Sequence, residues 1–386
     1  MKRSLFLMMI ALFIHSGCRD TKFEQLKGKA ESLCRELVPD ERTGICRVSV
    51  EKVQGGKAIV SGELLSPGYR EPLVRLVREA GFEVIDSLRV LPDTTLKGKI
   101  WGIISVSVAN LRSKPAHSAE LVSQAVMGTP VRILKKKRDW LFVQTPDHYL
   151  SWTNSSSLVE HTEQEMELWK RSDRVMFTGQ YGVIYGDDSQ RISDLVAGCI
   201  VKGKPGKGKY LQLELPDGRK GIAEATLFRD FTIWREAAPA LPENLVQAAM
   251  EFIGIPYMWG GTSSKALDCS GFTKTVWFLN GIVLERDASQ QYKYGEVTDA
   301  GLEQQNLQPG DLLFFGKKDP LRIIHVGIYA GKREVIHSSG KVWVNSLDST
   351  AANFSQYLFS TFVGVKRVLG ITSQPGYLAV KDHPWY

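Results

Sequence analysis

Leu267-Asp268-Cys269-Ser270-Gly271-Phe272, preceded by Tyr257-Met258-Trp259-Gly260-Gly261, is the stretch that decides the fold. After the cysteine, apolar residues recur at helical spacing and a helix-ending pair follows them: Phe272, Val276 and Leu279, then Asn280-Gly281. A glycine-rich, aromatic loop therefore delivers one cysteine to the start of an amphipathic helix. The free N–H groups and the dipole of a helix N-terminus stabilise a thiolate, the nucleophilic form of cysteine. The stretch thus predicts a nucleophile at Cys269.

Two histidines lie on predicted strands downstream of this helix. His325 begins an apolar run over 325–330, and His337 lies in the return strand 334–338 after a Gly-Lys-Arg turn. A hairpin that pairs residues of equal parity puts both side chains on one face, whereas a slip of one residue separates them. A thiol needs an adjacent imidazole to take its proton and a third polar group to orient that imidazole. A lone strand histidine is more often structural, but Cys269, His325 and His337 together favour these three roles.

Residues 243–369 resemble the NlpC family of papain-like cysteine peptidases, which cleave bacterial cell-wall peptides. The resemblance rests on five short pieces of sequence: Tyr257-x-Trp259-Gly260-Gly261, Asp268-Cys269-Ser270-Gly271, Arg286-Asp287-Ala288-Ser289-Gln290-Gln291, Pro309-Gly310-Asp311-Leu312 and His325-Val326-Gly327-Ile328-Tyr329. It implies an α+β papain-like fold in which the cysteine helix packs against a β-sheet. It also implies Cys269 as nucleophile, His325 as general base and His337 as the orienting residue, with no cofactor. The backbone N–H of Cys269 is expected to stabilise the oxyanion.

Two segments upstream are rich in short strands between turns, which predicts small β-barrels at 99–165 and 172–233. In the first, strands are expected at 103–108, 130–134, 140–144 and 149–152. Asn110-Leu111-Arg112-Ser113-Lys114-Pro115, with Trp140 and Trp152, resembles bacterial SH3-like domains of cell-wall enzymes. The second segment repeats the pattern faintly, with a strand at 211–215. Any small β-domain would show such strands, which is the alternative to two SH3-like barrels.

Two SH3-like modules before such a catalytic domain resemble the γ-D-glutamyl-L-diamino-acid endopeptidases of the YkfC type. Those enzymes hydrolyse the bond between D-glutamate and the diamino acid of peptidoglycan stem peptides, and a closed end of their cleft holds a free N-terminal L-Ala. The resemblance places five residues around that amine: Tyr257, Asp268 and Ser270, with Tyr149 and Glu120 from the first module. A carboxylate and hydroxyls suit an ammonium group. In the competing structural roles, Asp268 caps the cysteine helix, Tyr149 is a barrel core residue and Glu120 is a solvated charge.

The N-terminus reads as a targeting segment over 1–18. Lys2-Arg3 is followed by a short apolar run over 5–14 and by His15-Ser16-Gly17-Cys18. Small residues before a cysteine resemble a bacterial lipobox, in which Cys18 is lipidated; His15 departs from the usual pattern, and an ordinary secretory signal is the alternative. The sequence therefore predicts an exported, periplasmic lipoprotein of the cell envelope, anchored to a membrane by lipid and monomeric, with no nucleic-acid partner.

Residues 19–98 read as a small α+β module of unassigned role. Helices are expected at 22–37 and 72–80, and strands at 47–51, 57–63 and 82–91. Cys34 and Cys46 lie twelve residues apart, and an oxidising compartment would permit a disulfide between them. Cys199, in an apolar strand-like run over 195–201, is expected to be a buried structural cysteine. There is no Cys-x-x-Cys motif or histidine-rich pair, so no metal is expected.

The chain carries a formal net charge of +7, with basic runs at 135–138 and 202–209. These runs read as solvated turns that could attract anionic envelope polymers. Residues 203–209 match the phosphate-loop pattern G-x-x-x-x-G-K, but Tyr210 replaces the required Ser or Thr and a strand follows instead of a helix. Nucleotide binding is therefore rejected.

The whole sequence predicts a multidomain peptidase that ends in a tail over 370–386. The expected reaction is hydrolysis of the γ-D-glutamyl–L-diamino acid bond in stem peptides with a free N-terminal L-Ala, as in cell-wall recycling. Alternatives are a wall-remodelling D,L-endopeptidase acting on intact peptidoglycan, a catalytically silent wall-binding protein, and an amidase or acyltransferase on the same fold.

Overall fold

The computed structural model describes residues 22–237, 241–297, 306–370, 373–374 and 376–386. The predicted targeting segment and Cys18 lie outside these residues. The chain divides into two compact units, Met1–Leu96 and Lys97–Tyr386, each of which is described by itself. Among the described residues, no helix combines the length and the apolar character needed to cross a membrane.

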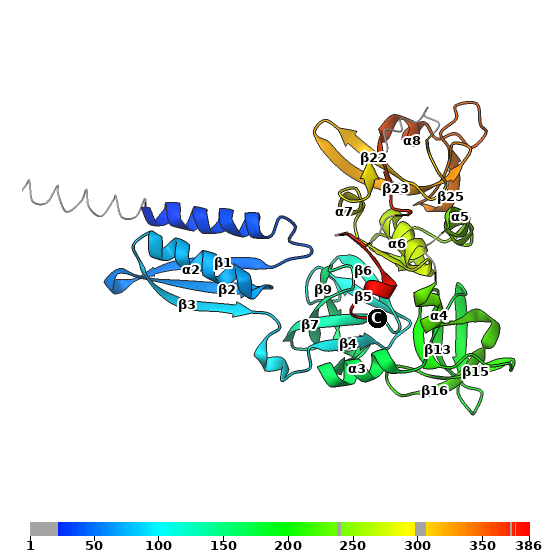
Figure 1. Ribbon diagram of the computed structural model, residues 1–386, viewed down its shortest axis with the longest axis horizontal. Coiled ribbons are helices and arrows are strands. Elements are labelled where there is room, and N and C mark those ends of the chain that lie inside the picture. The colour runs from blue at the N-terminus through cyan, green and yellow to red at the C-terminus, as the bar shows by residue number, and fades with distance from the viewer. Residues whose placement is uncertain (1–21, 238–240, 298–305, 371–372, 375) are drawn as a thin grey trace, which may run out of the picture. The chain divides into compact units, whose positions relative to one another are not determined.

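The first unit is a three-stranded sheet with two helices packed on one of its faces (Figure 1). Strands β1 (Cys46–Val53) and β2 (Lys57–Leu64), predicted at 47–51 and 57–63, pair as an antiparallel hairpin, and β3 (Glu83–Val90) runs parallel to β2 after helix α2 (Arg70–Glu79). The helix over 22–37 shares a core with α2 and the sheet. Cys34 and Cys46 form the disulfide, which ties that helix to β1.

The second unit begins with a seven-stranded antiparallel sheet in the order β10-β4-β7-β8-β9-β5-β6. Its strands are β4 (Trp101–Ile104), β5 (Val108–Arg112), β6 (Leu121–Val126), β7 (Pro130–Lys137), β8 (Trp140–Gln144), β9 (Leu150–Asn154) and β10 (Leu158–His161). The predicted continuous strand 103–108 is wrong. β4 ends at Ile104, and the chain bends at Val106 and Ser107 before β5 begins at Val108.

Helix α3 (Glu163–Arg171) leads into a second seven-stranded sheet in the order β13-β12-β16-β15-β14-β11-β17. Its strands are β11 (Arg174–Phe177), β12 (Tyr181–Tyr185), β13 (Arg191–Val196), β14 (Ile200–Gly203), β15 (Tyr210–Glu214), β16 (Lys220–Glu224) and β17 (Phe228–Asp230). Read from the opposite edge, its order matches the first sheet strand for strand, so the faint sequence repeat is a repeat of topology. Among the described residues, pairing closes neither sheet into the predicted barrel.

The second module departs from one sequence expectation, an unbroken strand over 195–201, and keeps the buried cysteine. The apolar run over 195–201 is not one strand, because Gly198 adopts a φ of +87° and turns the chain between β13 and β14. Cys199 in that turn is nevertheless fully buried, as predicted. The phosphate-loop-like stretch connects β14 to β15, and no helix follows it. The strand predicted at 211–215 after this stretch is confirmed as β15.

The C-terminal domain packs helices against a six-stranded sheet of order β21-β26-β22-β23-β24-β25 (Figure 1). The sheet strands are β21 (Glu296–Val297), β22 (Leu312–Lys318), β23 (Leu321–Gly331), β24 (Glu334–Ser339), β25 (Lys341–Ser346) and β26 (Phe362–Arg367). The helices are α5 (Pro242–Met250), α6 (Cys269–Leu279), α7 (Ala288–Gln291) and α8 (Gln356–Thr361). The preceding helix α4 (Phe231–Glu236) instead contacts β11 and β17 of the second module. Phe272, Val276 and Trp277 of α6 are fully buried in one core with apolar residues of β22, β23 and β24. The predicted packing of the cysteine helix on a sheet is confirmed.

The tail is ordered where it is described. Its strand β27 (Tyr377–Ala379) pairs with β20 (Ile282–Leu284), which follows α6. His383 Nε2 then donates to the Pro146 carbonyl of the first module at 2.9 Å. Tyr386 is buried against Phe231 and Phe278. The tail thus ties the catalytic domain to the modules before it.

Candidate active site

Cys269 is the first residue of α6, as the sequence predicted. Its sulfur lies against the backbone N–H groups of Ser270 and Val326. Burial, followed by the charge of Asp268, raises the pKa of the Cys269 thiol to about 12, and the two N–H groups oppose this rise only in part. Desolvation therefore outweighs the stabilisation of a thiolate by the helix N-terminus, in keeping with the expected need for an adjacent base. A base must take the proton as the sulfur attacks.

His325 and His337 share one face of the sheet. Strands β23 and β24 pair Ile328 with Ile336, so residues of equal parity lie opposite each other and the register condition is fulfilled. His325 Nε2 lies 2.9 Å from His337 Nδ1. Burial, and then the neighbouring imidazole, lowers the pKa of His325 to about 3. Both rings are therefore neutral at neutral pH, and His325 can accept a proton.

Asn345 extends this pair into a chain of three side chains. Its Oδ1 lies 2.9 Å from His337 Nε2, and its Nδ2 donates to the Asn353 carbonyl at 3.0 Å. Burial lowers the pKa of His337, and the hydrogen bond to Asn345 opposes that shift. Sequence reasoning missed Asn345, because an asparagine in an alternating strand carries no signal of its own.

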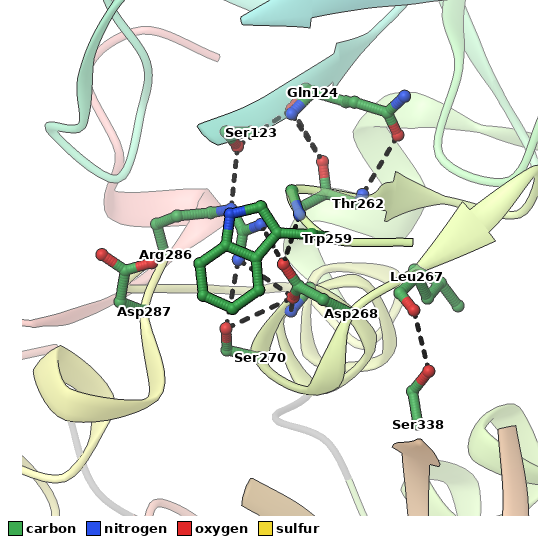
Figure 2. Close-up of polar contacts among 12 residues, drawn as sticks. Ser123, Gln124, Trp259, Thr262, Leu267, Asp268, Ser270, Arg286, Asp287 and Ser338 are labelled. Atoms are coloured by element: carbon green, nitrogen blue, oxygen red, sulfur yellow. Dashed lines mark hydrogen bonds and ion pairs between the residues drawn. The ribbon is translucent and has the colours of Figure 1, made fainter. Parts of the chain in front are cut away.

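Asp268 is held by a dense set of donors (Figure 2). It caps α6 by accepting from Gly271 N at 2.7 Å, and it accepts from Gly260 N at 2.9 Å. Arg286, itself buried, donates to both carboxylate oxygens at 3.1 and 2.5 Å. Burial alone would lower the pKa of Arg286, but Asp268 reverses the effect and raises it. Asp268 therefore fills the capping role that competed with amine binding, and its charge is already paired.

Ser270 and Tyr257 lie beside this carboxylate, as expected. Ser270 Oγ is 3.4 Å from Asp268 Oδ1 and accepts from Arg286 at 3.1 Å. Burial raises the pKa of Tyr257 to about 12, and the charges of Cys269 and Asp268 add to the rise. The tyrosine is therefore close enough to both groups to feel their charge. The structure thus gathers Tyr257, Asp268 and Ser270 next to the nucleophile.

The first SH3-like module reaches the same place. Arg286 Nε donates to Ser123 Oγ of β6 at 3.1 Å (Figure 2). Tyr149 is buried and lies close enough to Arg286 to raise its pKa. Glu120 accepts from Trp259 Nε1 at 2.9 Å. Both residues proposed from this module therefore border the catalytic loop, Tyr149 beside Arg286 and Glu120 beside Trp259.

Hydrogen bonds and an ion pair connect the hairpin before Cys269 to both β-modules. Strands β18 (Thr262–Ser263) and β19 (Ala266–Leu267) form this hairpin. Gln124 of the first module exchanges backbone and side-chain hydrogen bonds with Thr262, at 2.8 to 3.1 Å. Lys265 pairs with Asp194 of the second module at 2.7 Å and donates to Ser107 of the first at 3.0 Å. The position of Cys269 therefore depends on all three domains.

Two further points complete the site. In the part of the chain that the structure describes, no three His, Cys, Asp or Glu side chains gather so that they could hold a metal ion.

Arg286 had a signal in the sequence, because it belongs to one of the five family-like pieces, but no role could be derived for it there. Its role appears only when the fold brings Asp268 and Ser123 to it.

Comparison with known proteins agrees with this architecture. A model of the NlpC/P60 family matches residues 254–362, and a model of the bacterial dipeptidyl-peptidase Sh3 domain matches residues 111–158. Dipeptidyl-peptidase 6 of Lysinibacillus sphaericus is 28% identical over 277 residues, covering 68% of this chain and 97% of that protein. The gamma-D-glutamyl-L-lysine dipeptidyl-peptidase of Bacillus subtilis (strain 168) is 39% identical over 229 residues, covering 56% of this chain and 71% of that protein.

Among solved structures, the crystal structure of an NlpC/P60 family protein from Bacillus cereus ATCC 10987 superposes with a TM-score of 0.61. It is 22% identical in sequence, and the match covers 69% of this chain and 99% of that chain. At this identity the likeness establishes the shared fold.

Proposed function

The chain belongs to the NlpC/P60 family, and from this premise we propose that it hydrolyses the γ-D-glutamyl–L-diamino acid bond of peptidoglycan stem peptides that carry a free N-terminal L-Ala. The family makes it a cysteine peptidase with a peptidoglycan-derived peptide as substrate. The finer substrate choice is supported by the name of the Bacillus subtilis relative and by the SH3-like module that borders the catalytic loop.

The proposed reaction starts at Cys269, whose sulfur lies against the backbone N–H of Val326, the residue that follows His325. The thiol proton moves to His325 as the sulfur attacks the γ-glutamyl carbonyl, and the backbone N–H of Cys269 stabilises the oxyanion. His325 then protonates the leaving amine of the diamino acid, and the acyl group stays on the sulfur. Water attacks the thioester with His325 again as base, which frees the γ-glutamyl carboxylate and restores the thiol.

The contact between Arg286 and Ser123 is the observation that carries the substrate proposal. Through this contact the first module lies next to Asp268, Ser270 and Tyr257 and can contribute residues to the same binding site. Glu120 is exposed, whereas the charge of Asp268 is already neutralised by its ion pair with Arg286. We therefore assign the charge that receives the substrate ammonium to Glu120, with Tyr149, Tyr257 and Ser270 as hydroxyl partners.

The test compares two substrates by mass spectrometry of their products. One is the free tripeptide L-Ala-γ-D-Glu-diaminopimelate, and the other is the same peptide still attached to N-acetylmuramic acid. Cleavage of only the free peptide is expected, because the attached sugar removes the ammonium that Glu120 would bind. Equal cleavage of both would overturn the recycling assignment in favour of wall remodelling.

Replacing Cys269 by alanine separates an enzyme from a silent wall-binding protein. We expect Cys269→Ala to reduce hydrolysis of the free tripeptide to background, because no other described free thiol lies at the site; Cys199 is buried in the second module. The thermal midpoint should stay close to that of the parent chain. Undiminished turnover by the variant would contradict the mechanism.

We further propose that the protein is an exported monomer, anchored in the bacterial envelope by lipid on Cys18. The basic and apolar residues before that cysteine support this location. Metabolic labelling with a palmitate analogue tests it, with Cys18→Ser as the unlabelled control.

A further inference from the structure

The hydrogen bonds of Asn345 run in one direction. The Asn353 carbonyl can only accept, so the amide nitrogen of Asn345 must face it, as it does at 3.0 Å. The amide oxygen then faces His337 Nε2 at 2.9 Å. An amide oxygen can only accept, and therefore His337 carries its proton on Nε2.

The same reasoning fixes the proton on the next ring. A neutral imidazole protonated on Nε2 has a lone pair on Nδ1. His337 Nδ1 lies 2.9 Å from His325 Nε2, so the hydrogen bond between them requires the proton on His325 Nε2. His325 Nδ1 is then unprotonated, which is the state that a base needs before it takes the proton of Cys269.

We propose that Asn345 is a positioning residue that selects this tautomer of both histidines and so keeps His325 ready to act as a base. The inference rests on the proposed function, because it assumes that His325 serves Cys269. The opposite tautomer of the pair would put a proton on His325 Nδ1 and leave two acceptors facing each other at Asn345. Without Asn345, His337 could carry its proton on either nitrogen.

The aromatic neighbours of His325 and His337 cannot set the tautomers of these rings, whereas Asn345 can. Phe315 packs beside His325 with ring centroids 5.8 Å apart, and Trp343 lies beside His337 at 6.0 Å. These aromatic rings hold the imidazole planes but offer no acceptor for a ring proton. Burial and the His337 imidazole act on the pKa of His325, while burial and Asn345 act on that of His337.

Two substitutions at Asn345 test the proposal through kinetics. Asn345→Leu keeps the volume and removes the acceptor, so kcat on the free tripeptide should fall roughly 10- to 100-fold, with KM within about twofold. Asn345→Asp keeps an acceptor and adds a charge that favours an imidazolium at His337. The acid limb of its kcat/KM profile should move up by about one pH unit or more, with activity recovering at higher pH.

The matched control is Lys341→Leu, which places a leucine at an exposed position of the same strand. It should leave kcat and the pH profile unchanged. Parental kcat in Asn345→Leu together with a parental pH profile in Asn345→Asp would overturn the proposal. If Asn345→Leu does not fold, the shifted profile of Asn345→Asp still decides.

A substrate-free measurement keeps this proposal separate from the proposed function. The full chain, labelled with ¹⁵N-histidine, should show His325 and His337 each protonated on Nε2 only, and Asn345→Leu should show a mixture of tautomers. A proton on His325 Nδ1 in the parent chain would refute the inference. If the parent cleaves no γ-glutamyl peptide, the proposed function fails while the tautomer assignment is still tested.

Discussion

At the scale of single residues, burial decides the chemical state of the site. Cys269, His325 and His337 sit where ionisation is costly, so the thiol and both imidazoles are neutral. The helix N-terminus contributes N–H groups to the sulfur, but these do not overcome desolvation. We therefore expect the proton to leave Cys269 as the sulfur attacks the substrate, without a preformed thiolate–imidazolium pair.

The alkylation of Cys269 should report this neutral state. Because its pKa is raised to about 12, the thiolate fraction should grow about tenfold per pH unit across the neutral range. The rate constant for iodoacetamide should therefore rise continuously from pH 5 to pH 9. Cys269→Ala supplies the background rate. A plateau between pH 5 and pH 8 would show a thiolate–imidazolium pair and contradict the expectation.

Arg286 should matter for stability because it neutralises a buried carboxylate. Arg286→Met leaves Asp268 buried without a cation, which costs about 3 to 5 kcal/mol. Urea titration of the full chain measures the change in the free energy of unfolding. Adding Asp268→Asn should recover a large part of that loss, since asparagine still caps a helix and carries no charge. A double variant no more stable than Arg286→Met would show that the ion pair is not the cause.

At the scale of elements, the loop before α6 is shaped by the module it touches. Gly260 has a φ of +80°, and a Cβ there would lie 2.5 Å from the Leu121 carbonyl oxygen of the first module. The glycine therefore allows β6 and the catalytic loop to approach each other closely. Glycine is therefore required at position 260 for steric reasons as well as for its place next to the catalytic cysteine.

Substitution at Gly260 should cost more than substitution at a glycine in open space. Gly260→Ala combines positive-φ strain with a backbone clash and should lower the free energy of unfolding by about 2 to 4 kcal/mol. Gly254 has a φ of +89° with nothing within 4 Å of a Cβ, so Gly254→Ala should cost only about 1 kcal/mol. Urea titration of both variants checks the difference. Equal losses would mean that the contact with Leu121 is unimportant.

At the scale of the whole molecule, the tail and both modules hold the catalytic domain in place. Lys274 of α6 pairs with Asp147 of the first module at 2.8 Å, next to the carbonyl that receives His383. His383 Nδ1 also accepts from Trp385 N at 3.2 Å. Both ring nitrogens are thus used by the neutral form, and burial lowers the pKa of His383 to about 4.

Lowering the pH should therefore reduce the free energy of unfolding of the protein. The unfolded chain binds a proton at His383 near pH 6.5 and the folded chain only near pH 4, so stability falls as the pH drops through this window. His383 should contribute a slope of up to about 1.4 kcal/mol per pH unit. His383→Asn should reduce the slope of unfolding free energy against pH between 6 and 4.5. An unchanged slope would mean that His383 is not titrated on unfolding.

The sequence by itself determined the family, the cysteine helix, the histidine strands and the existence of two similar β-modules. Those features are local, because helical spacing, strand alternation and short motifs are written in neighbouring residues. It predicted too long a strand at 103–108 and 195–201, because apolar runs do not reveal where a buried turn interrupts them.

Only the tertiary structure decided how charges and protons are arranged. Arg286 meets Ser123 across 163 residues of sequence, and Asn345 meets His337 across a strand pair. The protonation state of Cys269 depends on how deeply its side chain is buried, and burial cannot be predicted from the neighbouring residues. Partners distant in sequence and the degree of desolvation both arise from packing, and packing is what the fold adds to the sequence.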